Sequence, residues 1–191
     1  MPQATLRTAR LDLFPLRDEH LEHEVELDSD PEVLRYLFPG ARSRAEVEAA
    51  HRARMARAEA VDGLGLWAGF LRAEPGSFVG LWMLTPPHGP SQPQVPGEAD
   101  LGYRLLRRHW RQGLAGEGAR ELVRHGFDDL GLERIFAQTM AVNVASRATM
   151  ASIGMRFVRA FHEDHDEPVV GAEHGEVEYE LRRQDWLARR P

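Results

Sequence analysis

The segment whose residues indicate a chemical role most clearly is 110–119, which is rich in small residues. It reads Trp-Arg-Gln-Gly-Leu-Ala-Gly-Glu-Gly-Ala. It follows an apolar stretch, residues 99–106, that is typical of a strand, and it opens a helical pattern reaching about Leu130. Glycines at a strand-to-helix junction let a ligand come close to the backbone. The unpaired N–H groups and the positive dipole end of the first helical turn then face that ligand. The segment is therefore typical of an anion site, above all a phosphate site, although glycine at a helix start also serves packing.

The elements that must position this turn are helices mixed with runs of strands. We expect strands at residues 10–16, 66–71, 78–84, 99–106, 134–140, 156–162 and 177–182. We expect helices at residues 18–27, 31–37, 43–60 and 113–130, and a last one from Asn143 or Ala145 to Ile153. Two long loops remain, a proline-rich one at 85–97 and an acidic, histidine-bearing one at 163–176. This order predicts one domain over residues 1–191, of class α/β (α+β), with a mixed, mostly antiparallel twisted sheet of about seven strands and helices on both faces.

Composition narrows the class of protein. The chain has 191 residues, 42% hydrophobic and 28% charged, which is typical of a globular domain. It has no cysteine, so disulfides, thiolate metal sites and cysteine nucleophiles are excluded. A formal net charge of −6 argues against broad nucleic-acid binding. All 24 basic residues are arginine, so a nucleotide kinase with a phosphate-loop lysine is disfavoured. With neither a long apolar run nor a signal-peptide pattern, we expect a cytoplasmic protein that does not enter membranes.

Two motifs in order give the chain a family resemblance. The glycine turn follows the fourth strand, and Asn143-Val144-Ala145-Ser146 follows the fifth, ending in the 153–157 sequence Ile-Gly-Met-Arg-Phe. In these features the chain resembles the GNAT superfamily of acyl-CoA N-acyltransferases. It is most similar to the branch of ribosomal-protein serine/alanine N-terminal acetyltransferases, which tends to have tryptophan at the position of Trp110, followed by Gly-x-Ala-x-Glu, as in residues 113–117. The resemblance covers residues 10–182 and implies the GNAT fold.

The resemblance implies acetyl-CoA as the co-substrate and assigns residues to it. Its pyrophosphate would be held by backbone groups of the glycine turn: Arg111, Gln112, Gly113, Leu114, Ala115 and Gly116. Its pantetheine arm would pair like an extra strand with the splayed fourth strand, around Tyr103, Leu105 and Leu106. A backbone N–H near Leu105 or Leu106 would polarise the thioester carbonyl. Asn143 and Ser146 would reach the arm and the sulfur from the next helix.

The same resemblance directs the search for a catalytic acid. Many family members use a tyrosine on the helix after the fifth strand to protonate the leaving thiolate, and that position is Met150 here. Ser146, one turn from Asn143, is the substitute that we expect. The alternative is that Ser146 only caps the helix or binds the arm.

The base has several candidates. Several family members carry glutamate where Gln138 stands, and glutamine is not a useful proton acceptor. Asp100 and Glu98 enter the fourth strand, where a half-buried cleft would raise a carboxyl pKa toward neutrality. Glu98 is better explained as an exposed strand end. His162 titrates in the right range without tuning, but it also fits a solvated loop residue. A chain of waters without a dedicated base is also compatible with a free amine.

The acceptor is expected to be a primary amine, either a protein N-terminal α-amine or a small molecule. Tyr36 and Phe38, in a turn that borders the acceptor cleft in this family, are candidate lining residues, although core packing also explains them. The acidic segment 163–176 would attract a cationic amine. A metal site there is disfavoured, because the segment runs into Pro168 and Gly171, so we expect no metal.

The resemblance implies that transfer proceeds by direct attack in a ternary complex. Relatives in this branch are often dimers, so a homodimer is a further expectation. A competing hypothesis is a non-catalytic acyl-CoA-binding sensor, since Met150 and Gln138 depart from the usual acid and base. A dinucleotide-binding domain is disfavoured, because the spacing of Gly113, Gly116 and Gly118 does not match Gly-x-Gly-x-x-Gly.

Overall fold

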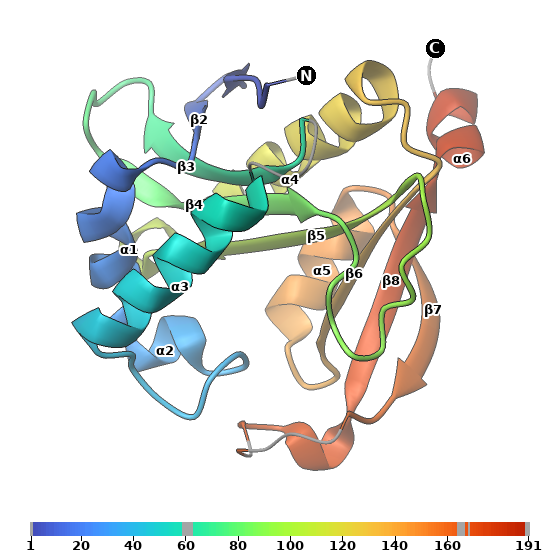
Figure 1. The fold of residues 1–191 in the computed structure, drawn as a ribbon. Coiled ribbons are helices and arrows are strands. Elements are labelled where there is room, and N and C mark those ends of the chain that lie inside the picture. Colours follow the sequence, from blue (N-terminus) through green and yellow to red (C-terminus); the bar gives the residue numbers. More distant parts are fainter. Residues whose placement is uncertain (1, 59–62, 164–166, 168, 190–191) are drawn as a thin grey trace.

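The computed structural model describes residues 2–58, 63–163, 167 and 169–189. Its centre is a mixed sheet in the order β1-β2-β3-β4-β5-β6-β8-β7 (Figure 1). The strands are β1 (Leu6–Arg7), β2 (Leu11–Pro15), β3 (Gly65–Leu71), β4 (Phe78–Thr85), β5 (Glu98–Leu105), β6 (Arg134–Met140), β7 (Arg156–Phe161) and β8 (Glu176–Arg182). Neighbouring strands are antiparallel except β5 and β6, which are parallel.

Strands β5 and β6 pair over only part of their length and then separate. The two strands pair only from Glu98–Arg134 to Asp100–Phe136. Beyond Asp100 both strands continue, β5 to Leu105 and β6 to Met140, without pairing. The sheet is therefore split from this point onward, and the exposed backbone edges of two parallel strands face each other across the split.

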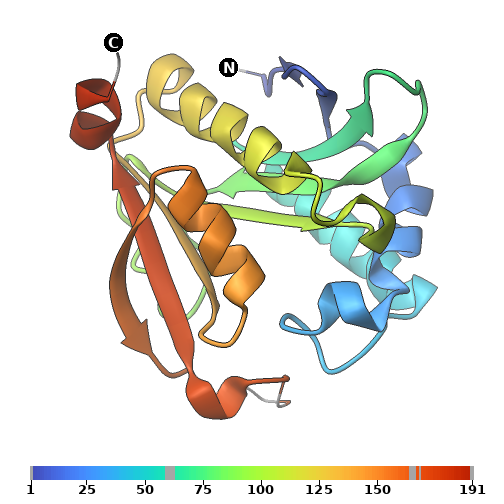
Figure 2. The same cartoon turned by 180° about the vertical axis from the view of Figure 1, so that it is seen from behind.

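Helices cover both faces of the sheet (Figures 1 and 2). One face carries α1 (Leu21–Asp28), α2 (Pro31–Leu34) and α3 (Arg44–Ala58), and the other carries α4 (Leu114–Arg124) and α5 (Val144–Ser152). The main core lies under α4 and α5 and includes Trp82, Leu122 and Phe127, all buried. Helix α4 lies so close to β4 that a Cβ at Gly118 would be 2.5 Å from the indole of Trp82. This position therefore requires glycine.

Local signals in the sequence account for most element boundaries. The side chain of Asp30 caps α2 by accepting from the N–H of Glu32, and Ser43 and Glu46 form a capping box at α3. The seven expected strands are confirmed within one to two residues at each end. The end expected for the third helix, near residue 60, lies outside the described residues.

The structure also corrects several boundaries. The two-residue β1 was not expected, and neither was α6 (Arg183–Ala188). The helix expected over 18–27 begins instead as the short 3-10 turn η1 (Asp18–His20), which leads into α1. The helix expected over 113–130 is α4 followed by a π-helical turn, η3 (His125–Asp129). Among the described residues, none of the helices has the length and apolar content required to cross a bilayer.

Candidate active site

The alternation of hydrogen bonds along β5 shows which of its backbone groups face the split. The N–H of Leu106 donates to the carbonyl of Val79, 2.9 Å away, so this residue faces β4. Successive residues of a strand point their backbone N–H and C=O groups alternately toward its two neighbouring strands. Arg104 therefore also bonds toward β4, whereas Tyr103 and Leu105 present their backbone N–H groups toward β6. The Leu105 carbonyl accepts the indole N–H of Trp110 at 2.7 Å. Of the two expected polarising groups, the N–H of Leu106 is already used, and that of Leu105 is left.

The glycine turn presents donors at the end of β5. Gly113 is the N-cap of α4 with φ of 77°, a left-handed conformation that favours glycine. The first bond along the helix runs from the N–H of Glu117 to the carbonyl of Gly113. In the part of the chain that the structure describes, the N–H groups of residues 113–116 donate to no acceptor. Four donors and a helix N-terminus therefore converge on one place, as a diphosphate requires.

A side-chain cluster that the sequence analysis missed holds this turn in place. Glu117 accepts hydrogen bonds from the Thr8 hydroxyl at 2.6 Å and from the backbone N–H of Arg10 at 2.8 Å. The Arg10 guanidinium pairs with Glu117 and also donates to the carbonyl of Gln112 at 2.9 Å. The start of α4 is therefore tied to the β1–β2 turn. Arg111 next to it has φ of 59° and is exposed.

Helix α5 closes the split from the face that carries α4. Asn143 caps α5, because its side-chain carbonyl accepts from the N–H of Ser146, and its amide donates to the Thr139 hydroxyl. The Tyr103 hydroxyl lies 3.2 Å from the carbonyl and 3.4 Å from the hydroxyl of Ser146. Burial raises the pKa of Tyr103. The structure thus brings together three expected residues, Tyr103, Asn143 and Ser146, while Met150 is in the core.

The other face of the split carries the candidate base. Asp100 is 7% exposed, and burial raises the pKa of its carboxyl to about 6. Gln92 donates from its side-chain nitrogen to Asp100 at 3.0 Å and to Gln138 at 2.9 Å. Gln138 in turn donates to Glu178 at 2.9 Å. A carboxyl that titrates near neutrality therefore lies where β5 and β6 separate.

Next to Asp100, buried carboxylates are neutralised by arginine. Arg134 pairs with Glu98, Glu178 and Glu180 at 2.6–2.7 Å. Burial opposes ionisation of Glu180, but hydrogen bonds from its arginine partners prevail and lower its pKa to about 2. Glu98 is thus part of an ion-pair network and not a free strand end. Asp100 differs from these carboxylates because its described hydrogen bond comes from an uncharged amide.

The remaining candidates lie at the rim or elsewhere. His162 is exposed just beyond β7, and the register places its neighbour Phe161 opposite Glu176 on β8. Two strands separate it from β5, so it is not brought together with Asp100. Tyr36 and Phe38 are half-buried after α2, and Arg42 stacks on the Phe38 ring at 4.7 Å.

The loop after α2 and the segment 169–175 lie at the same end of the molecule (Figures 1 and 2). Much of the acidic segment, residues 164–166 and 168, lies outside the described residues. Across the described ranges, no three His, Asp or Glu side chains form a group that could hold a metal.

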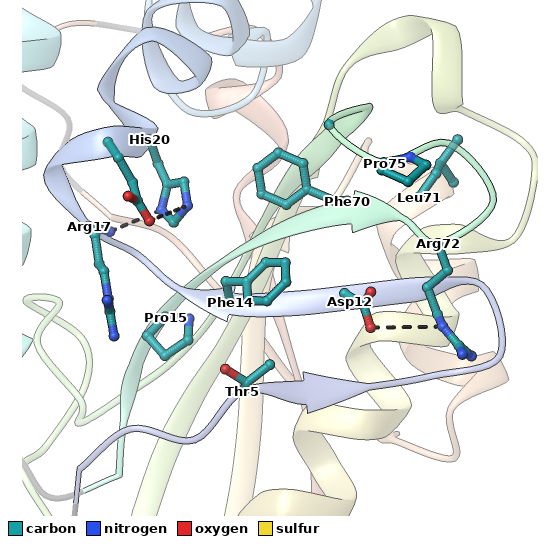
Figure 3. Close-up of a pocket in the computed structure, with 12 residues that line it drawn as sticks. Thr5, Asp12, Phe14, Pro15, Arg17, His20, Phe70, Leu71, Arg72 and Pro75 are labelled. Atoms are coloured by element: carbon teal, nitrogen blue, oxygen red, sulfur yellow. Dashed lines mark hydrogen bonds and ion pairs between the residues drawn. The ribbon is translucent and has the colours of Figure 1, made fainter.

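A separate surface pocket of about 470 Å³ lies between β2, β3 and η1 (Figure 3). Phe14 and Phe70 line it, and Asp12 and Arg72 form an ion pair of 3.8 Å at one end. Two strands, β3 and β4, separate β2 from β5, so the pocket is not part of the split.

With this geometry described, comparison with known proteins identifies the family. The profile of the acetyltransferase (GNAT) domain matches residues 10–156. The chain belongs to the GNAT acetyltransferase family. It is 43% identical over 189 residues to an FsC-acetyl coenzyme A-N(2)-transacetylase of Aspergillus fumigatus, covering 97% of this chain and 79% of the relative. GNAT membership and this relative establish an acetyl-CoA-dependent N-acetyltransferase.

Solved GNAT structures share the fold. The ribosomal-protein alpha-N-acetyltransferase RimL, in complex with coenzyme A, has a TM-score of 0.77 at 15% identity, covering 95% of this chain and 99% of that one. Spermidine N-acetyltransferase from Vibrio cholerae, in complex with CoA and spermine, has a TM-score of 0.73 at 14% identity, covering 93% and 98%. At these identities the likeness concerns the fold.

Proposed function

We propose that this GNAT enzyme transfers acetyl from acetyl-CoA to a primary amine by direct attack in a ternary complex, with Asp100 as the general base. One observation carries the choice of base: the Asp100 carboxyl is buried where β5 and β6 separate, and its pKa of about 6 suits proton transfer at neutral pH. The ion-paired carboxylates beside it lack this property, because hydrogen bonds lower both pKa values: those from Gln138 and arginine for Glu178, and those from arginine for Glu180.

The described residues fit the coenzyme. Four unpaired N–H groups at residues 113–116 would bind the diphosphate, and the split edge of β5 would pair with the amide-rich arm. When bound, the thioester supplies an activated acetyl group. Tyr103 and Leu105 both present an N–H toward it, but Tyr103 is three residues from Asp100, about 10 Å along the strand, and Leu105 is five residues away. Tyr103 is therefore the better donor to the carbonyl oxygen for a base at Asp100.

Proton movements follow from this placement. The amine nitrogen forms a bond to the carbonyl carbon, the carbon–sulfur bond breaks, and the thiolate leaves. The proton that the amine loses goes to Asp100, directly or through one water. The thiolate receives a proton from the Ser146 hydroxyl, which regains one from solvent water, and Asp100 releases its proton to solvent. Tyr103 approaches this hydroxyl to 3.4 Å, and the Asn143 cap holds Ser146 at the first turn of α5.

For the acceptor we propose a small-molecule amine. The relative that matches 97% of the chain at 43% identity is named for acetylation at an N(2) position, whereas the enzymes named for a protein terminus or spermidine share only 14–15% identity. Tyr36 and Phe38 would line the entrance, at the end of the molecule where the described segment 169–175 also lies (Figures 1 and 2).

The test is CoA release measured with a thiol reagent against a panel of amines: free α-amino acids, simple alkyl diamines, spermidine and a Ser-Ala peptide. Turnover that is fastest on a small-molecule amine is expected, and turnover that is fastest on the peptide would contradict the choice of acceptor. Tight acetyl-CoA binding with no turnover on any amine would contradict the proposal and favour a non-catalytic acyl-CoA sensor.

A further inference from the structure

Gln92 is the one residue of the proline-rich loop whose side chain reaches the candidate base. Its side-chain oxygen accepts from the backbone N–H groups of His88 and Gly89, at 2.9 and 3.0 Å. Its nitrogen donates to the carboxylate of Asp100 and to the carbonyl oxygen of Gln138. With two bonds given and two accepted, the full hydrogen-bonding capacity of this amide is used.

These contacts have the form that an acceptor amine requires. A single –NH2 nitrogen lies between a carboxylate on β5 and a carbonyl oxygen on β6, at the point where the two strands separate. A primary amine has the same donors and would meet the same two oxygens. We propose that Asp100 and Gln138 form the subsite for the acceptor amine, and that Gln92 occupies it as an internal mimic that the acceptor must displace. This inference rests on the proposed function, because it places the Gln92 side chain in the acceptor site of that same reaction.

The proline-rich loop 85–97 can move away from this subsite without disrupting the sheet. It connects β4 and β5 and passes in front of β6 and β8 in the view of Figure 1, and prolines at 86, 87, 90, 93 and 96 give it few N–H groups to bond. Between residues 88 and 95 its described hydrogen bonds to the middle of the sheet are those of Gln92 and one from Arg159 to the carbonyl of Ser91 at 3.2 Å. Two more, His88 with Thr85 and Val95 with Glu98, lie at the two ends of the loop, where it joins β4 and β5. Pro93, Gln94 and Val95 are exposed. Displacement therefore breaks few contacts.

A purely structural role for Gln92 makes a different prediction. If the side chain only clamped β5 to β6, its removal would loosen the split and weaken acetyl-CoA binding. If it competes with the acceptor, its removal leaves acetyl-CoA binding unchanged and strengthens amine binding, because the open subsite no longer has to be vacated first.

The experiment uses the full chain saturated with CoA and the variants Gln92→Ala and Gln94→Ala. Gln94 is a matched control, being the same residue type in the same loop, exposed and without a described side-chain bond. The probe is methylammonium, which carries only the amine, and tetramethylammonium has the charge without an N–H donor. Binding is followed by the carboxyl 13C resonance of Asp100. Because this readout needs no turnover, it stays informative even if no amine in the panel is acetylated.

Methylammonium should bind Gln92→Ala about 3- to 10-fold more tightly than the wild type, the range expected for losing one competing hydrogen-bonded group. Gln94→Ala and tetramethylammonium should show no such gain. In the wild type, methylammonium should shift the side-chain amide resonance of Gln92, which keeps the test decisive if Gln92→Ala does not fold. Unchanged or weaker amine binding in Gln92→Ala, or an undisturbed Gln92 resonance, would overturn the proposal.

Discussion

Asp100→Asn should make the protein more stable and nearly inactive at the same time. The carboxyl titrates near pH 6 in the folded chain and near its ordinary value of 3.8 when the chain is unfolded. The folded state therefore binds this proton more tightly than the unfolded state does. The ionised carboxylate of Asp100 destabilises the folded state: this effect is absent below pH 4, grows between pH 4 and 6, and is complete above pH 6. At about 1.4 kcal/mol for each pKa unit, it amounts to about 3 kcal/mol at pH 8.

Asparagine removes the buried charge and still accepts the bond from Gln92. Urea unfolding should therefore give Asp100→Asn a free energy of unfolding that exceeds the wild type's by up to about 3 kcal/mol at pH 8, and an equal one at pH 4. Glu180→Gln is the matched comparison with the opposite sign: arginine lowers the pKa of Glu180, so this variant should lose stability at pH 8.

Activity provides the second half of the test. The wild-type kcat/KM should fall about tenfold per pH unit below pH 6, because the base must be ionised. Asp100→Asn should lose that limb and about 10²- to 10⁴-fold of kcat, the usual contribution of a general base. A variant that keeps the acidic limb, or one that is less stable than the wild type at pH 8, would refute the assignment.

Three further variants test the coenzyme site and the ion-pair network. Gly113→Glu should abolish acetyl-CoA binding, measured by calorimetry, because it places a carboxylate beside the diphosphate donors, while Gly76→Glu, at a similar φ of 85° in an open turn, should bind normally. Ser146→Ala should lower kcat more than acetyl-CoA affinity; equal losses would indicate a binding role only. Arg134→Gln should destabilise the fold by about 1.5–3 kcal/mol in urea, since it removes the most buried guanidinium among those that pair with Glu178 and Glu180, whereas Arg156→Gln, with an exposed guanidinium, should lose much less.

Specific results would contradict the predictions for the coenzyme site and the ion-pair network. Normal coenzyme affinity in Gly113→Glu would mean that the diphosphate binds elsewhere. Equal stability of the two arginine variants would mean that the network is screened by solvent.

Much of the fold could be predicted because its signals are local. The capping box at Ser43, the Asp30 cap and the strand at 134–140 depend on residues within a few positions of one another. The glycine turn was also predicted, since its conformation is set by Gly113 itself. The elements that were missed have weak local signals: β1 has two residues, and α6 lies at the very end of the described chain.

The amino-acid sequence by itself determined the element order and predicted a phosphate-binding turn over residues 111–116, with Asp100, Ser146 and His162 as catalytic candidates. Only the tertiary structure decided which backbone groups of β5 face the split, because that depends on its register with β4. It also decided that Asp100 is buried beside an uncharged amide while its neighbours are paired with arginine, and that Gln92 reaches it from a distant loop. Such properties depend on which surfaces the folded chain removes from water and which partners it brings there, and no local pattern encodes either.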